Sequence, residues 1–125
     1  MAAVLVTGAD ESPEIARLLE QAGHTVHRNA PQALDVLVNT AALAPETFEA
    51  KVAGLAEVLQ TYLPALERSA APVVVNVSDS ELLTKAAATV VTEQYARAFP
   101  HVRINAAEQN AVARLVRDGG YFESE

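Results

Sequence analysis

The chain has 125 residues, a formal net charge of −7 and no cysteine. This length is enough for one domain with a buried core, and the absence of cysteine excludes disulfides and thiolate metal sites. The acidic balance argues against nucleic acids and anionic membranes as partners, because both bind basic surfaces.

Metal binding and membrane insertion are also not expected from the sequence. The three histidines, His24, His27 and His101, are scattered, and no pair has the spacing of metal ligands on a predicted helix. No apolar run reaches the roughly 18 residues of a membrane-spanning helix, and no basic segment precedes the first apolar strand. We therefore expect a cytoplasmic protein.

Apolar runs and helical periods alternate along the chain. The helix predicted at 45–69 has the clearest pattern, since Leu55, Leu59 and Leu66 recur at helical spacing. Continuous apolar strands separated by helices indicate a parallel sheet that is buried on both faces. In chain order, the sequence predicts a strand at 4–6, a helix at 13–22, strands at 25–27 and 34–39, a helix at 45–69, a strand at 72–77, a helix at 80–98, a strand at 102–105 and a helix at 109–116.

The connection between the second and third predicted strands is unusually short. Residues 28–33, which include Pro31, cannot hold a crossover helix, because such a connection needs about a dozen residues or more. We therefore expect the chain to pass by a loop from one side of the first strand to the other. With right-handed crossovers elsewhere, the expected strand order is 2-1-3-4-5.

The first strand ends in Thr7-Gly8, which is the usual approach to a dinucleotide phosphate. A phosphate-binding turn needs further glycines so that the backbone can approach the diphosphate. Here Gly8 is followed by three acids and a proline, Asp10, Glu11, Glu14 and Pro13. Each carboxylate would repel a diphosphate by about 1 kcal/mol at 4 Å in water, so we expect no bound NAD(H), NADP(H) or other cofactor. The acids and the proline also fit the start of a helix, whose dipole favours negative charge there.

Five parts of the chain resemble motifs of the short-chain dehydrogenase/reductase family, in the family's order. The resemblance covers nearly the whole chain and implies a shortened Rossmann-like, doubly wound α/β sandwich over residues 1–125. The implied sheet is parallel and five-stranded, with helices on both faces. The resemblance also implies a homodimer, because family members pair the two long helices. The matching parts are residues 7–9 (TGxxxGxG), 35–42 (DxLVNNAG), 63–66 with 73–78 (LPxL and IVNVSS), 84–87 (SKAA) and 102–106 (IRVNA).

The departures from the family lie at its functional positions. The later glycines of the phosphate loop and the segment with the adenine-pocket aspartate are missing, and Glu108-Gln109 replaces a Pro-Gly pair. In the catalytic tetrad, the asparagine position falls at Lys51, the serine position at Asp79 and the tyrosine position at Glu81. Only Lys85 matches. A glutamate cannot replace a tyrosine that gives its proton to a forming alkoxide.

The charged residues at these positions have two interpretations. In the structural one, Ser78 and Glu81 form a capping box at the start of helix 80–98, and Glu81 and Lys85 form an i,i+4 ion pair. In the functional one, the four tetrad positions cluster at the carboxyl end of the central strands, where ligands bind open α/β sheets. Such a cluster is either a structural network in the old active site or a catalytic group.

The sequence thus leaves three functions open. The first is a non-redox relative of the family that has lost cofactor binding and catalysis and acts by association with itself or with a full-length relative. The second is a small, cofactor-independent acid/base enzyme in which Lys51, Asp79, Glu81 and Lys85 are catalytic. The third is NAD(P)-dependent reduction, which the altered phosphate loop and tetrad disfavour. For the first, we expect a homodimer built on the two long helices, with no metal, membrane or nucleic acid bound.

Overall fold

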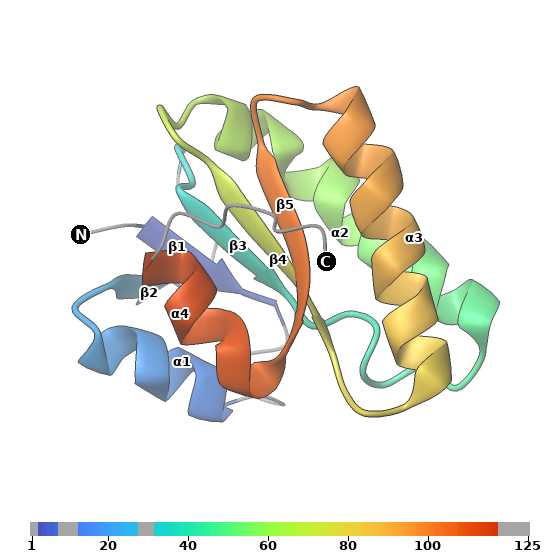
Figure 1. Cartoon of the computed structure of the whole chain (residues 1–125). Helices are drawn as coiled ribbons and strands as arrows, with labels where there is room; N and C mark the ends of the chain where they lie inside the picture. Colours follow the sequence, from blue (N-terminus) through green and yellow to red (C-terminus); the bar gives the residue numbers. More distant parts are fainter. Residues whose placement is uncertain (1–2, 8–12, 28–31, 118–125) are drawn as a thin grey trace.

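The computed structural model describes residues 3–7, 13–27 and 32–117. They form a five-stranded, all-parallel sheet with the order β2-β1-β3-β4-β5 (Figure 1). The fold is α/β and Rossmann-like, and the expected strand order is confirmed. The strands are β1 (Ala3–Val6), β2 (Thr25–His27), β3 (Val36–Asn39), β4 (Val73–Ser78) and β5 (Arg103–Glu108). The helices are α1 (Pro13–Gln21), α2 (Phe48–Glu67), α3 (Leu82–Ala98), the short 3₁₀ helix η1 (Gln109–Ala111) and α4 (Val112–Arg117).

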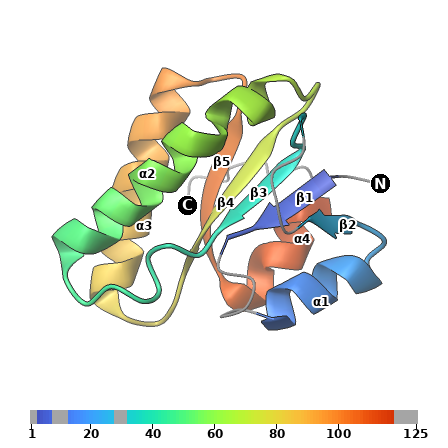
Figure 2. The same ribbon diagram turned by 180° about the vertical axis from the view of Figure 1, so that it is seen from behind.

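Helices cover both faces of the sheet, as expected for a doubly wound fold. α2 and α3 lie on one face, and α1 and α4 lie on the other (Figure 1, Figure 2). Successive side chains of a strand point to opposite faces. Leu37, Val74 and Ile104 therefore pack in the cluster beneath α2 and α3, whereas Val38 and Val75 pack in the cluster beneath α1 and α4. The core thus consists of two buried layers, one on each face of the sheet.

β1 lies between β2 and β3, although β3 is the next described element after β2 along the chain. Val4 of β1 is aligned with Val26 of β2 on one side and with Val36 of β3 on the other. The chain therefore crosses from one side of β1 to the other between β2 and β3. This confirms the crossing that the short spacing predicted.

Asp35 connects three elements at the amino end of the sheet. Its Oδ2 accepts a hydrogen bond from the backbone N–H of Ala3 (2.9 Å), and its Oδ1 accepts one from the Ser69 hydroxyl (2.6 Å). The hydrogen bond from the Ala3 N–H is the largest cause of the lowered pKa of Asp35, and the bond from the Ser69 hydroxyl adds to it. Together they outweigh the partial burial of the carboxyl group, which raises its pKa. The start of β1, the start of β3 and the segment after α2 are thereby held together.

The carboxyl ends of β1 and β3 are also tied to each other. The Thr7 N–H donates to the Val38 carbonyl (3.0 Å), and the Thr40 N–H donates to the Thr7 Oγ1 (3.0 Å). The Thr40 hydroxyl donates to the Thr7 carbonyl. The buried Asn39 donates from its Nδ2 to the Leu55 carbonyl in the middle of α2 (3.1 Å). The loop after β3 is therefore fixed against both the sheet and α2.

Several predicted element boundaries differ from the structure. α2 begins at Phe48 rather than at residue 45, because the Thr47 Oγ1 accepts a hydrogen bond from the Ala50 N–H (3.1 Å) and caps the helix there. β5 continues to Glu108, because its residues stay in register with β4 as far as Ser78. The expected last helix is instead divided into η1 and α4.

Candidate functional site

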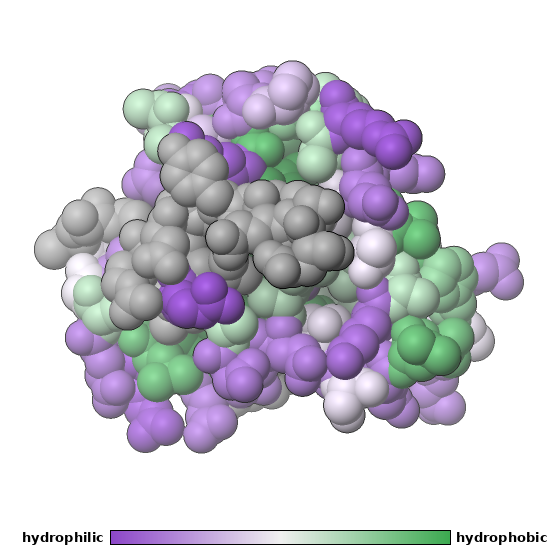
Figure 3. Space-filling view, viewed as in Figure 1, coloured by the Kyte–Doolittle hydropathy of each residue, from purple (hydrophilic) through white to green (hydrophobic). Residues whose placement is uncertain are grey.

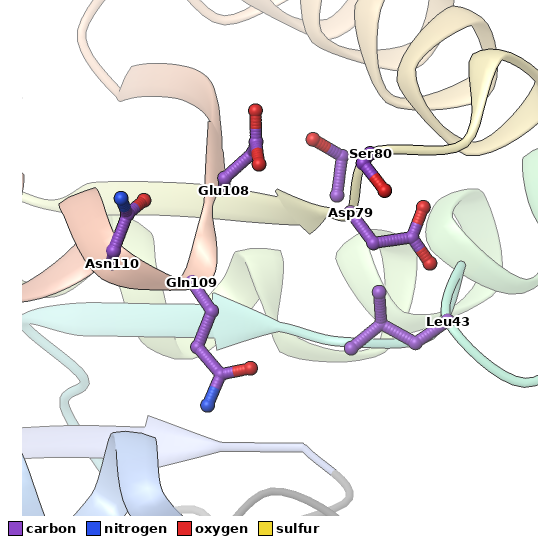
Figure 4. Close-up of a pocket in the computed structure, with 7 residues that line it drawn as sticks. Leu43, Asp79, Ser80, Glu108, Gln109 and Asn110 are labelled. Carbon is purple, nitrogen blue, oxygen red and sulfur yellow. The ribbon is translucent and has the colours of Figure 1, made fainter.

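Three cavities lie where the chain leaves the carboxyl ends of β3, β4 and β5, the edge at which open α/β sheets bind ligands. The first, which we call the β4–β5 cavity, has a volume of about 460 Å³. Figure 4 shows Asp79 and Ser80 from the turn after β4 across from Glu108 at the end of β5. The cavity is lined by Leu43, Ser78, Asp79, Ser80, Glu108, Gln109 and Asn110.

The second cavity, which we call the Lys51 cavity, has a volume of about 430 Å³ and lies at the amino-terminal ends of α2 and α3. It shares Leu43 with the β4–β5 cavity. The third has a volume of about 260 Å³ and includes Ser78, Lys85 and Glu108. The Lys51 cavity is lined by Leu43, Ala44, Pro45, Glu46, Lys51, Glu81, Leu82 and Leu83.

Asp79 shapes the turn into α3. Its Oδ1 accepts a hydrogen bond from the backbone N–H of Glu81 (2.9 Å). Glu81 is the N-cap residue of α3 and makes no capping hydrogen bond with its own side chain. The expected capping box of Ser78 and Glu81 is therefore wrong. Ser78 still belongs to β4, paired with Glu108, so the helix starts too late for Ser78 to cap it.

Lys85 pairs with Glu108, not with Glu81. Its Nζ lies 3.4 Å from the Glu108 Oε2, and both side chains are about half exposed. Glu81 is the N-cap residue, with extended backbone angles (φ −73°, ψ 137°), and its carbonyl accepts a hydrogen bond from the Lys85 N–H (3.1 Å). The expected ion pair between the two side chains does not form. A pair this exposed contributes roughly 0–1 kcal/mol to stability.

Lys51 points into the protein from the first turn of α2. Its side chain is 2% exposed, and its Nζ donates a hydrogen bond to the Ala42 carbonyl (2.8 Å). Among the described residues, no carboxylate lies within ion-pair distance of this ammonium group. Lys51 is therefore a buried cation that one neutral carbonyl partly compensates.

The four predicted site residues all lie at this edge of the sheet, but they line different cavities. Lys51 and Glu81 line one cavity, Asp79 lines its neighbour and Lys85 lines the third. In the described part of the chain, neither lysine forms an ion pair with Asp79 or Glu81. The expected network of two bases facing two acids is therefore not formed.

The sequence interpretation missed the role of Glu108 and the exposure of two leucines. Glu108 was considered only as a replacement for a family residue, yet it lines two cavities and pairs with Lys85. The available signal was an acidic residue three positions after the last predicted strand, 102–105. Leu82 and Leu83 line the Lys51 cavity and are 81% and 51% exposed. Two adjacent leucines just after the polar run 78–81 were the corresponding signal.

The structure bears on three other sequence predictions, which concern the phosphate loop, metal binding and membrane insertion. The phosphate-loop positions Gly8 and Asp10 lie outside the described residues. Within the described ranges, no group of three or more His, Asp or Glu side chains is placed to hold a metal ion. None of the described helices is both long and apolar enough to cross a membrane.

Comparisons with models of known protein families, with curated proteins and with solved structures each found no match.

Proposed function

We propose that the protein is a non-redox relative of the short-chain dehydrogenases/reductases that acts by association, with a second copy of itself or with a full-length relative. The observation that carries this proposal is the outer surface of α2 and α3, which pack side by side over one face of the sheet. On α3, Leu83, Ala86 and Val90 are exposed at positions i, i+3 and i+7. They therefore form an apolar stripe on the side of the helix that faces away from the sheet.

The composition of this stripe fits a contact between two helices. Leu83 is 51% exposed and Val90 is 37% exposed, and the small Ala86 between them allows close approach. Figure 3 shows hydrophobic surface on the side of the molecule where the first half of α3 lies. Contiguous exposed apolar patches larger than a few hundred Å² mark interaction sites in soluble proteins. A two-fold contact, in which each copy uses the same surface, is the commonest way to cover such a patch.

The proposal is tested by the mass of the protein in solution. We expect light scattering at tens of micromolar to give twice the chain mass of 13.2 kDa. Val90→Glu places a charge in the contact and should give the monomer mass, because the buried carboxylate would be left unpaired.

Leu18→Glu is the matched control, since Leu18 is 41% exposed on α1, which lies on the opposite face of the sheet. It should leave the dimer intact. If the wild-type protein has a mass of 13.2 kDa at every concentration, self-association is contradicted. If Val90→Glu and Leu18→Glu both convert the dimer to monomer to the same extent, the proposed surface is contradicted.

A second proposal is a small, cofactor-independent acid/base enzyme, and the shared cavity of Lys51 and Glu81 favours it. Asp79 and Lys85 then act from the neighbouring cavities. If catalysis is the function, Glu81→Gln should abolish the cellular role of the protein while its melting temperature is unchanged. Loss of both together would indicate a structural role instead.

A further inference from the structure

The ammonium group of Lys51 is buried, and its hydrogen-bond partner is a neutral carbonyl. An ammonium group carries three hydrogen-bond donors, and Lys51 uses one of them, toward the Ala42 carbonyl. Its side chain is 2% exposed, and no described carboxylate lies within 4.0 Å of it. Buried charges in proteins are normally paired, because removing an isolated ion from water is costly. Lys51 therefore has donors left for an anionic group that this part of the chain does not supply.

The Lys51 cavity also carries two acids and an apolar rim. Glu46 and Glu81 are exposed side chains that line it together with Lys51. Leu82 and Leu83 lie at its edge, and they are the two most exposed of the large hydrophobic side chains in the described residues. The volume of about 430 Å³ lies within the range of about 300–1,000 Å³ that is typical of small-molecule sites.

We propose that the Lys51 cavity binds a small zwitterion with an apolar side chain, namely a free aliphatic α-amino acid. Its carboxylate would pair with the Lys51 ammonium group, and its ammonium group would pair with Glu46 or Glu81. The aliphatic side chain would cover Leu82 and Leu83. A simple anion is disfavoured because both glutamates would repel it, and a simple cation is disfavoured because Lys51 would repel it.

The site overlaps the surface proposed for association at one residue, Leu83, which lines the cavity and begins the stripe on α3. The charged groups of the site, Lys51, Glu46 and Glu81, are not part of the stripe. Calorimetry measures ligand binding and light scattering on the same titrated samples measures dimerisation, so the two proposals can be told apart.

Isothermal titration calorimetry of the whole chain with L-leucine tests the proposal. Three related compounds each lack one recognised group. They are 4-methylpentanoate, which lacks the ammonium group, 3-methylbutylamine, which lacks the carboxylate, and glycine, which lacks the side chain. We expect leucine to bind and each of the three to bind at least tenfold more weakly.

Variants locate the binding in this cavity. Lys51→Met keeps about the same side-chain length and should weaken leucine binding at least tenfold. Glu81→Gln should also weaken leucine binding. Glu93→Gln is the control, because Glu93 is an exposed acid of α3 that does not line the cavity, and it should leave the affinity unchanged. If Lys51→Met does not fold, Glu46→Gln and Glu81→Gln decide the question, since both side chains are exposed.

Two results would overturn the proposal. One is an absence of heat with millimolar leucine. The other is binding of 4-methylpentanoate as tight as that of leucine, since the glutamates would then have no role in recognition.

Discussion

Asp35 should make the stability of the protein depend on pH. The Ala3 N–H and the Ser69 hydroxyl lower its pKa in the folded state, so the carboxylate stabilises the fold above its unfolded pKa of about 3.9. This contribution is lost as the pH falls through the folded pKa. We expect Asp35→Asn to lower the free energy of unfolding by about 1–3 kcal/mol at pH 7, and the difference to shrink as the pH falls below about 4. Urea denaturation at several pH values measures this.

Glu20→Gln is a suitable control for the Asp35 measurement, because Glu20 is an exposed acid of α1. Its effect on stability should be small at every pH. A loss in Asp35→Asn that stays the same from pH 7 to pH 3 would show that the charge of Asp35 is not the cause.

The partners of the two lysines show why single contacts were hard to predict. The predicted ion pair of Glu81 and Lys85 needed α3 to begin a few residues earlier. The helix begins at Leu82. The observed partner, Glu108, comes from β5 and depends on the register of two strands, which no local pattern reveals. The burial of Lys51 was more accessible from the sequence, because Lys51 precedes the buried Leu55 by four residues and therefore shares its side of the helix.

At the scale of elements, Gly54 lies where α2 approaches the loop after β3 closely. A Cβ at this position would lie 3.3 Å from the Ala41 carbonyl oxygen. Gly54→Val would push against the loop that holds the Ala42 carbonyl for Lys51. We expect it to lower the free energy of unfolding by about 1–3 kcal/mol, measured by urea denaturation.

Ala53→Val provides the matched comparison for Gly54→Val. Ala53 is the neighbouring residue of α2 and is exposed, so a valine there costs only helix propensity, which is at most about 0.7 kcal/mol. Equal free energies of unfolding for the two variants would mean that the loop can shift away from the valine without destabilising the fold.

The elements themselves were predictable because their signals are long and local. The buried run of β4, Val73–Ser78, identifies a strand with both faces covered, and the short spacing before β3 indicated the crossing over β1. The ends of the helices were less predictable. They depend on single hydrogen bonds, such as the one from the Ala50 N–H to Thr47 and the one from the Glu81 N–H to Asp79, and several residues in each segment could have made them.

At the scale of the whole molecule, the fold is one that often binds nucleotides, but the acidic sequence of the first turn disfavours nucleotide binding. We expect NADPH to bind with a dissociation constant weaker than about 100 μM, which corresponds to about 5.5 kcal/mol. The reason is electrostatic, since Asp10, Glu11 and Glu14 follow Gly8. Titration of NADPH with the protein, followed by nicotinamide fluorescence, measures this. Tighter binding would restore NAD(P)-dependent chemistry as a candidate.

The cavities could not be predicted from the sequence in the way that the strand order could. Each is enclosed by parts of the chain that lie far apart in sequence, such as Leu43, Asp79 and Glu108 around the β4–β5 cavity. The sheet order places these parts at one edge, and the sequence predicted that much. Which residues line each cavity depends on side-chain directions, which only the packed structure determines.

The position of β1 has a consequence for shortening the chain. Chain ends usually tolerate trimming, because they tend to lie at the margins of a domain. Here β1 (Ala3–Val6) lies between β2 and β3 and makes hydrogen bonds on both sides. Removal of β1 would therefore open a gap inside the sheet and leave β2 without its hydrogen-bonded neighbour, whereas removal of β2 would take away only an edge strand.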